Sequence, residues 1–147
     1  MERILAALSD LPVRVVASTG PELDPGELQV PDNIELRRWV PHSLVLPQAA
    51  LMVTHAGLGS LMAAFAHGVP CLCIPLGRDQ PRNAARASEL GAAIALPRDA
   101  QVAAIRAAVV ESLDSEDLRT NAGRLQRAIA EYRNGSRGVT ALEELVG

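Results

Sequence analysis

The chain has 147 residues and a net charge of −3, and 48% of its residues are hydrophobic and 21% charged. These values exclude intrinsic disorder and predict one globular domain over residues 1–147, while the mild negative charge excludes attraction to nucleic acid. No apolar run approaches the roughly 20 residues that cross a membrane and no signal-like segment follows Met1, so we expect a cytoplasmic chain with no nucleic-acid partner and no membrane span.

The first third of the chain predicts a short helix and two strands. Residues 2–8 favour the end of a helix, and the β-branched run at residues 13–17 favours a buried strand. Residues 19–33 are rich in Pro, Gly and Asp and predict a loop. Residues 34–40 then alternate apolar and polar side chains, which is typical of a second strand.

Strands and helices alternate through the rest of the chain. Further strands are predicted at residues 50–54, 71–74 and 92–96, and helices at residues 57–67 and 81–90. Residues 100–146 are helical in about three pieces, with breaks near Asp114 and residues 134–136. This order predicts an α/β fold, a Rossmann-like doubly wound parallel sheet followed by C-terminal helices. In such a sheet, ligands bind outside the carboxyl ends of the strands.

Two cysteines, Cys71 and Cys73, lie two positions apart in one predicted strand. Residues at this spacing share a face of the strand, and their geometry does not suit a disulfide. No other cysteine is present to complete a metal site. We expect buried free thiols and no bound metal.

A glycine-rich turn joins a predicted strand to a helix at residues 53–60. The glycines Gly57 and Gly59 let the backbone approach a ligand, and the first amides of the helix favour an anion such as phosphate. His55 and the hydroxyl of Ser60 add two side-chain donors. The alternative is a plain helix cap beside a histidine whose hydrogen bonds are satisfied within the protein.

A second polar turn follows the next predicted strand. Asp79 and Gln80 accept and donate hydrogen bonds in a way that suits the vicinal hydroxyls of a sugar. The alternative is that Asp79 caps the following helix. These two residues are therefore candidates for sugar binding.

The single tryptophan, Trp39, lies beside a loop in a chain with 2% aromatic residues. Such a ring can stack on a nucleobase. Considered alone, a tryptophan in this position is more often a core residue, so both interpretations stay open.

The segments at residues 39–42, 55–60 and 68–80 resemble, in order and spacing, the signature of nucleotide-diphosphate-sugar glycosyltransferases. The resemblance covers essentially the whole chain and is to family 1 enzymes of the bacterial macrolide and antibiotic type, which are similar to UDP-glycosyltransferases and have two Rossmann domains in a GT-B architecture. It implies that this chain is the C-terminal, donor-binding half. The implied contacts are Trp39 and Val40 with the base, His55, Gly57, Gly59 and Ser60 with the pyrophosphate, and Asp79 and Gln80 with the sugar.

Two positions depart from the family pattern. Ala56 stands where many relatives have a glycine, and we expect alanine to be tolerated there. Ala63 stands where many relatives place a glutamate on the ribose hydroxyls. The loss of that contact favours a deoxyribose nucleotide such as dTDP, and the choice between a UDP-linked and a dTDP-linked donor stays open.

The resemblance also implies the reaction of the intact enzyme. An acceptor hydroxyl on a small molecule, a natural product or a glycolipid, displaces the nucleotide diphosphate with inversion. The general base belongs to an N-terminal acceptor domain that this chain lacks, so no catalytic residue and no transfer activity are expected here. The nucleotide sugar is a substrate, and no cofactor is implied. The family's half begins with a central strand, so we expect this chain to be truncated before its first strand.

Three other interpretations remain. The chain is a nucleotide-sugar-binding subunit of a two-chain transferase, not catalytic alone, or a sugar-nucleotide epimerase for which Asp79 is the candidate carboxylate. The third is a folded remnant without a ligand, which Ala56 and Ala63 favour.

Overall fold

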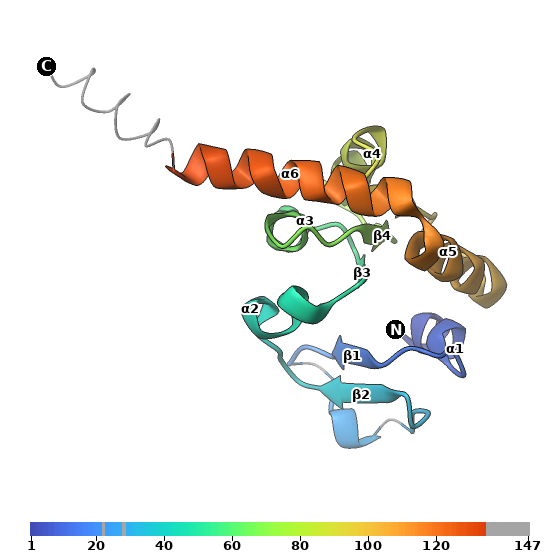
Figure 1. The fold of residues 1–147 in the computed structure, drawn as a ribbon. Coiled ribbons are helices and arrows are strands. Elements are labelled where there is room, and N and C mark those ends of the chain that lie inside the picture. The colour runs from blue at the N-terminus through green and yellow to red at the C-terminus, as the bar shows by residue number, and fades with distance from the viewer. Residues whose placement is uncertain (22, 28, 135–147) are drawn as a thin grey trace, which may run out of the picture.

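The structure is a computed structural model that describes residues 1–21, 23–27 and 29–134. Its strands are β1 (Val15–Ser18), β2 (Ile34–Arg37), β3 (Met52–Thr54), β4 (Cys71–Cys73) and β5 (Ala93–Ala95), drawn in Figure 1. Its helices are α1 (Glu2–Leu8), α2 (His42–Val45), α3 (Leu58–Ala66), α4 (Gln80–Glu89), α5 (Val102–Asp114) and α6 (Glu116–Asn134), with 3-10 turns η1 (Pro25–Glu27) and η2 (Leu46–Gln48).

Every strand pairing in the described residues is parallel, as the alternation of strands and helices predicts. The pair β1 and β2 forms one sheet, and β3, β4 and β5 form a second with β4 in the middle. The prediction of a single sheet therefore needs a correction. No described strand pairs with the edge of β1 opposite β2 or with the edge of β3 opposite β4, so the strands divide into two sheets.

Helices cover both faces of the three-stranded sheet, and the side chains of β4 show why. Cys71 and Cys73 pack with residues of α3, α4 and α6 on one face. Leu72 and Ile74, the residue that follows β4, pack with residues of α1 and α5 on the other. A central strand buried on both faces is uniformly apolar, as this one is. The doubly wound prediction is confirmed.

The thiols of β4 are free, buried and on the same face, as expected. Burial raises the pKa of both thiols, that of Cys73 to about 11, and the neighbouring Cys73 adds to the effect at Cys71. The described residues include no group of three or more His, Cys, Asp or Glu side chains suited to a metal ion.

Helix α6 packs across α3 (Figure 1), and its side chains reach the C-terminal ends of α3 and α4. Gly68 and Gly91 follow those two helices with φ of +70° and +67°. A Cβ atom at Gly68 would lie 2.9 Å from Gln126 Oε1, and one at Gly91 would lie 2.5 Å from Asn121 Nδ2. These glycines therefore combine a left-handed backbone with close packing against α6.

The predicted helices agree with the structure to within about two residues, and the predicted strands are longer than the observed ones. Strand β2 stops at Arg37 instead of residue 40, because the chain turns at Pro41 into α2. The third helical piece predicted after residue 134 lies outside the described residues. In the described part, no helix is both long enough and apolar enough to cross a membrane.

Candidate functional site

The predicted site residues follow the carboxyl ends of three strands. His55, Gly57, Gly59 and Ser60 come after β3, Asp79 and Gln80 come after β4, and Trp39 and Val40 come after β2. Because β3 and β4 are parallel neighbours, their loops lie at one edge of the three-stranded sheet. Trp39 and Val40 follow a strand of the other sheet, and no hydrogen bond within the described residues joins them to these loops.

The turn after β3 is built around Ala56. Its N–H donates to Thr54 Oγ1 over 3.3 Å. Ala56 is fully buried and has φ of +65°, in the left-handed region that costs a residue with a Cβ about 1–2 kcal/mol. The structure therefore accommodates alanine, but in a conformation that suits glycine better.

The ring of His55 lies against the backbone of Gly57. A Cβ atom added at Gly57 would come within 2.7 Å of His55 Nε2. The φ of Gly57 is −61°, which any residue adopts, so the need for glycine here is steric. The sequence predicted an amide contact at Gly57, and the structure adds a second role, because the missing side chain makes room for the imidazole.

Helix α3 begins without a side-chain cap. Gly57 is its N-cap, and no side-chain cap hydrogen bond forms, so Ser60 does not cap the helix. His55 is exposed, and its ring makes no hydrogen bond to the part of the chain that the structure describes. The alternative of a capped helix beside a satisfied histidine is therefore wrong. The positive end of a nine-residue helix and an imidazole face the same turn.

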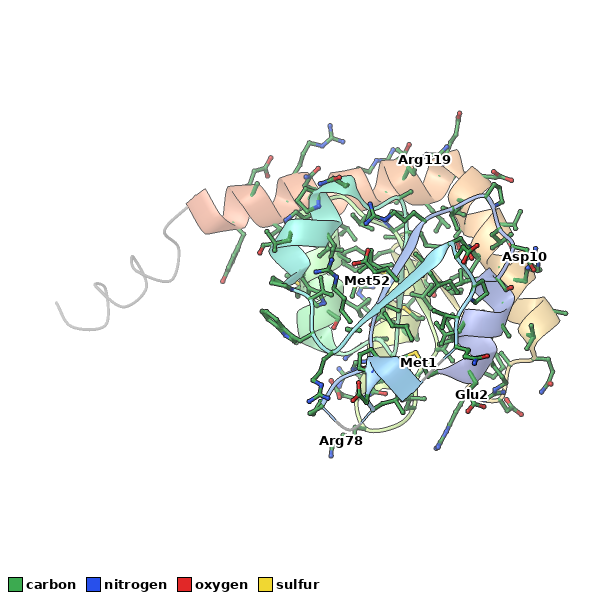
Figure 2. The ribbon with its side chains drawn as sticks, turned by 90° about the horizontal axis from the view of Figure 1, so that it is seen from below. Met1, Glu2, Asp10, Met52, Arg78 and Arg119 are labelled. Atoms are coloured by element: carbon green, nitrogen blue, oxygen red, sulfur yellow. The ribbon has the colours of Figure 1, made fainter. Side chains whose placement is uncertain are left out.

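Gln80 shapes the loop after β4. Its Oε1 accepts the N–H groups of Leu76 and Gly77 over 2.8 and 3.2 Å. These bonds orient the amide, so its NH2 group remains to donate to a ligand. Arg78 has φ of +58°, and Figure 2 shows its side chain projecting from the edge of the molecule.

Asp79 occupies the N-cap position of α4, but its carboxylate makes no capping hydrogen bond. The alternative of a side-chain cap is therefore wrong. Asp79 Oδ2 instead accepts from Asn83 Nδ2 over 2.8 Å. Asn83 was not predicted from the sequence, although an Asp and an Asn four positions apart on a helix are placed to meet.

Asn83 also reaches the other loop, because its Nδ2 donates to the carbonyl oxygen of Ala56 over 3.1 Å. The structure thus brings the turn after β3 and the loop after β4 together through one side chain.

Trp39 is 74% exposed, so the interpretation as a core residue is wrong. Val40 beside it is half-buried. Two large apolar side chains close to these turns are exposed as well, Leu58 at the first position of α3 at 59% and Leu76 in the loop after β4 at 57%. The site can therefore offer apolar surface, uncapped amides, an imidazole and a carboxylate.

Residues 2–145 match the family described as erythromycin biosynthesis protein CIII-like, C-terminal domain. The chain is 35% identical over 128 residues to tylactone mycaminosyltransferase of Streptomyces fradiae, covering 84% of this chain and 27% of that protein. The glycotransferase of kitacinnamycin has a similar structure, with a TM-score of 0.88, 32% identity, and coverage of 97% of this chain and 38% of the other. The glycosyltransferase VinC in complex with dTDP gives a TM-score of 0.77 and 28% identity over 85% of this chain and 32% of the other. The chain thus spans about a third of the length of these relatives.

Proposed function

The chain belongs to the family of erythromycin biosynthesis protein CIII-like C-terminal domains, found in macrolide- and antibiotic-type GT-B glycosyltransferases, and from this premise we propose that it binds the nucleotide-diphosphate sugar from which such an enzyme transfers a hexose. The observation that carries the proposal is the uncapped start of α3 with the exposed ring of His55 held against Gly57. Family membership also sets aside the epimerase interpretation.

We assign the diphosphate to the turn after β3. His55 donates to a phosphate oxygen, and the amides of Gly57 and Gly59 with the hydroxyl of Ser60 complete the anion site. Backbone amides at a helix start bind an anion without reorganisation, because the peptide dipoles are already aligned. This arrangement stabilises the departing diphosphate without a metal.

We assign the sugar to Asp79 and Gln80. Asp79 has one carboxylate oxygen bonded to Asn83 and a second that accepts from a sugar hydroxyl. The Gln80 oxygen is occupied by two backbone N–H groups, so its NH2 group donates to the sugar. An acceptor and a donor side by side match the hydroxyls of a hexose.

We assign the nucleobase to Trp39 and Val40. The exposed indole offers a stacking surface. Ala63 offers no carboxylate for a ribose hydroxyl, and the relative VinC was determined in complex with dTDP. Both observations support dTDP over UDP as the nucleotide.

The transfer itself needs a second domain. We propose direct displacement with inversion by a hydroxyl of a small-molecule acceptor, deprotonated by a base outside this chain. We assign no catalytic residue to residues 1–147. The glycosyltransferase relatives, more than twice as long as this chain, support that division of roles.

Calorimetric titration of the chain with UDP, dTDP and their glucose conjugates tests the proposal. We expect His55→Ala to weaken every ligand about tenfold or more, as loss of a charge-assisted hydrogen bond does. Asp79→Ala should weaken only the conjugates. Asp32→Ala, just before β2, is the matched control and should change neither the affinity for the nucleotides nor that for the conjugates. A folded wild-type chain that binds none of these ligands would refute the proposal and favour the remnant interpretation.

A further inference from the structure

Asn83 joins the two loops of the proposed site. It lies half-buried in the first turn of α4, with Nδ2 3.1 Å from the Ala56 carbonyl oxygen and 2.8 Å from Asp79 Oδ2. A side-chain amide carries two hydrogens on one nitrogen, so both bonds form together. Both partners only accept, which fixes the orientation of the amide.

On the side of β3, Asn83 holds a turn with an uncommon backbone. Both backbone polar groups of Ala56 form hydrogen bonds. Its N–H donates to Thr54 Oγ1, and its carbonyl oxygen accepts from Asn83 Nδ2. These bonds offset the cost of the left-handed φ of an alanine. Because the Ala56 carbonyl and the Gly57 N–H belong to one planar peptide group, the bond from Asn83 also fixes the direction of the Gly57 amide beside His55.

On the side of β4, Asn83 holds a carboxylate that caps no helix. The backbone N–H of Asn83 donates to the Asp79 carbonyl oxygen over 3.0 Å, and its side chain donates to Oδ2. Two bonds from one residue fix both the backbone and the side chain of Asp79. The second carboxylate oxygen remains for a ligand.

We propose that Asn83 is a positioning residue that sets the distance between the diphosphate contact at His55 and the sugar contact at Asp79. This inference rests on the proposed function of those two residues. In this role Asn83 acts through its bonds to Ala56 and Asp79 and needs no contact of its own with the donor. It couples the binding of the diphosphate to the binding of the sugar, so that the chain selects a nucleotide sugar over the free nucleotide.

The test is the ratio of dissociation constants for dTDP and dTDP-glucose, measured by calorimetry on the chain. Asn83→Ala is expected to lower this preference for the conjugate about tenfold. Asn83→Asp keeps the size of the side chain but removes both donated hydrogens, and should lower the preference at least as far. Asn121→Ala removes another bond from an asparagine Nδ2 to a carbonyl, that of Gly91 at 3.2 Å, and as the matched control should lower stability only.

A double-mutant cycle separates positioning from simple support of the fold. If Asn83 acts through Asp79, adding Asn83→Ala to Asp79→Ala causes no further loss of preference. A folded Asn83→Ala chain with the wild-type preference, or losses that add in the double variant, would overturn the inference.

Amide chemical shifts of the ligand-free chain test the coupling independently of donor binding. Asp79→Ala should shift the amides of residues 57–60 when Asn83 is present and leave them in place in the Asn83→Ala background. Equal shifts in both backgrounds would overturn the coupling. If the wild-type chain binds no donor, the proposed function fails, and these shifts still decide whether Asn83 connects the loops.

Discussion

The contact between His55 and Gly57 concentrates the proposed phosphate chemistry in two neighbouring residues. The contact with the backbone of Gly57 favours ring orientations that place Nε2 near the start of α3 before a ligand arrives. Restricting a donor in this way lowers the ordering cost of binding. Gly57 makes this contact possible because it has no side chain.

Gly57→Ala is therefore expected to weaken dTDP binding about tenfold, nearly as much as His55→Ala. The added Cβ would lie 2.7 Å from Nε2, and the exposed ring has room to swing away. Stability should fall by about 1 kcal/mol, because alanine is a poorer N-cap than glycine. Calorimetry and urea unfolding measure the two quantities, and unchanged dTDP affinity would contradict the assigned role of the ring.

Side chains of strand β4 pack on both faces of its sheet, and burial in this packing determines the pKa values of its two thiols. Burial disfavours the thiolate and raises the pKa of Cys73 from 9.0 to about 11 in the folded chain. Above pH 9 the unfolded chain loses protons that the folded chain retains. The free energy of the unfolded chain then falls relative to that of the folded chain.

The contribution of Cys73 to the free energy of unfolding should therefore be constant below about pH 8 and fall as the pH rises from 9 towards 11. The slope approaches about 1.4 kcal/mol per pH unit for each thiol. Urea unfolding at a series of pH values measures it. Cys73→Ala removes one titrating group, so its slope in this range should be smaller, and an identical slope would show that other groups cause the loss.

The packing of helix α6 depends on the glycines that follow α3 and α4. Gly68 has both a left-handed backbone and Gln126 within 2.9 Å of a built Cβ. Gly123 lies inside α6 with nothing within 4 Å of a built Cβ. The same substitution at these two positions should have opposite effects.

Gly68→Ala is expected to lower the free energy of unfolding by about 1–2 kcal/mol. Gly123→Ala should raise it by up to about 1 kcal/mol, the gain of alanine over glycine in a helix. Urea midpoints of the two variants and the wild type measure both changes. Loss of stability in Gly123→Ala would contradict the open space beside it.

At the scale of the whole molecule, a donor that binds only the folded chain should stabilise all of it. A nucleotide at 100 times its dissociation constant contributes about 2.7 kcal/mol, so the melting temperature should rise. Because amides and His55 bind the phosphates in the proposed site, the rise with dTDP should be the same in excess EDTA as in Mg²⁺. Thermal unfolding in both buffers measures it, and a rise that requires Mg²⁺ would indicate a metal-dependent site.

The overall architecture was predictable because it rests on local patterns. The uniformly apolar run at β4, the glycines after α3 and α4 and the polar turns after the strands each lie within a few consecutive residues. Neighbours in sequence decide such patterns, so the parallel strands and the helices on both faces were predicted correctly. The division into two sheets was not, because strand pairing joins segments that are distant in sequence.

By itself, the sequence determined that this protein has a doubly wound α/β fold and resembles a glycosyltransferase family, since both follow from residue types at fixed spacings. Only the tertiary structure decided that Trp39 is exposed, that Asp79 caps no helix, and that Asn83 links Asp79 to Ala56. Exposure and hydrogen-bond partners depend on which elements pack beside a residue. Asn83 and Ala56 are 27 positions apart, and only the packing of α4 beside the turn after β3 brings them together.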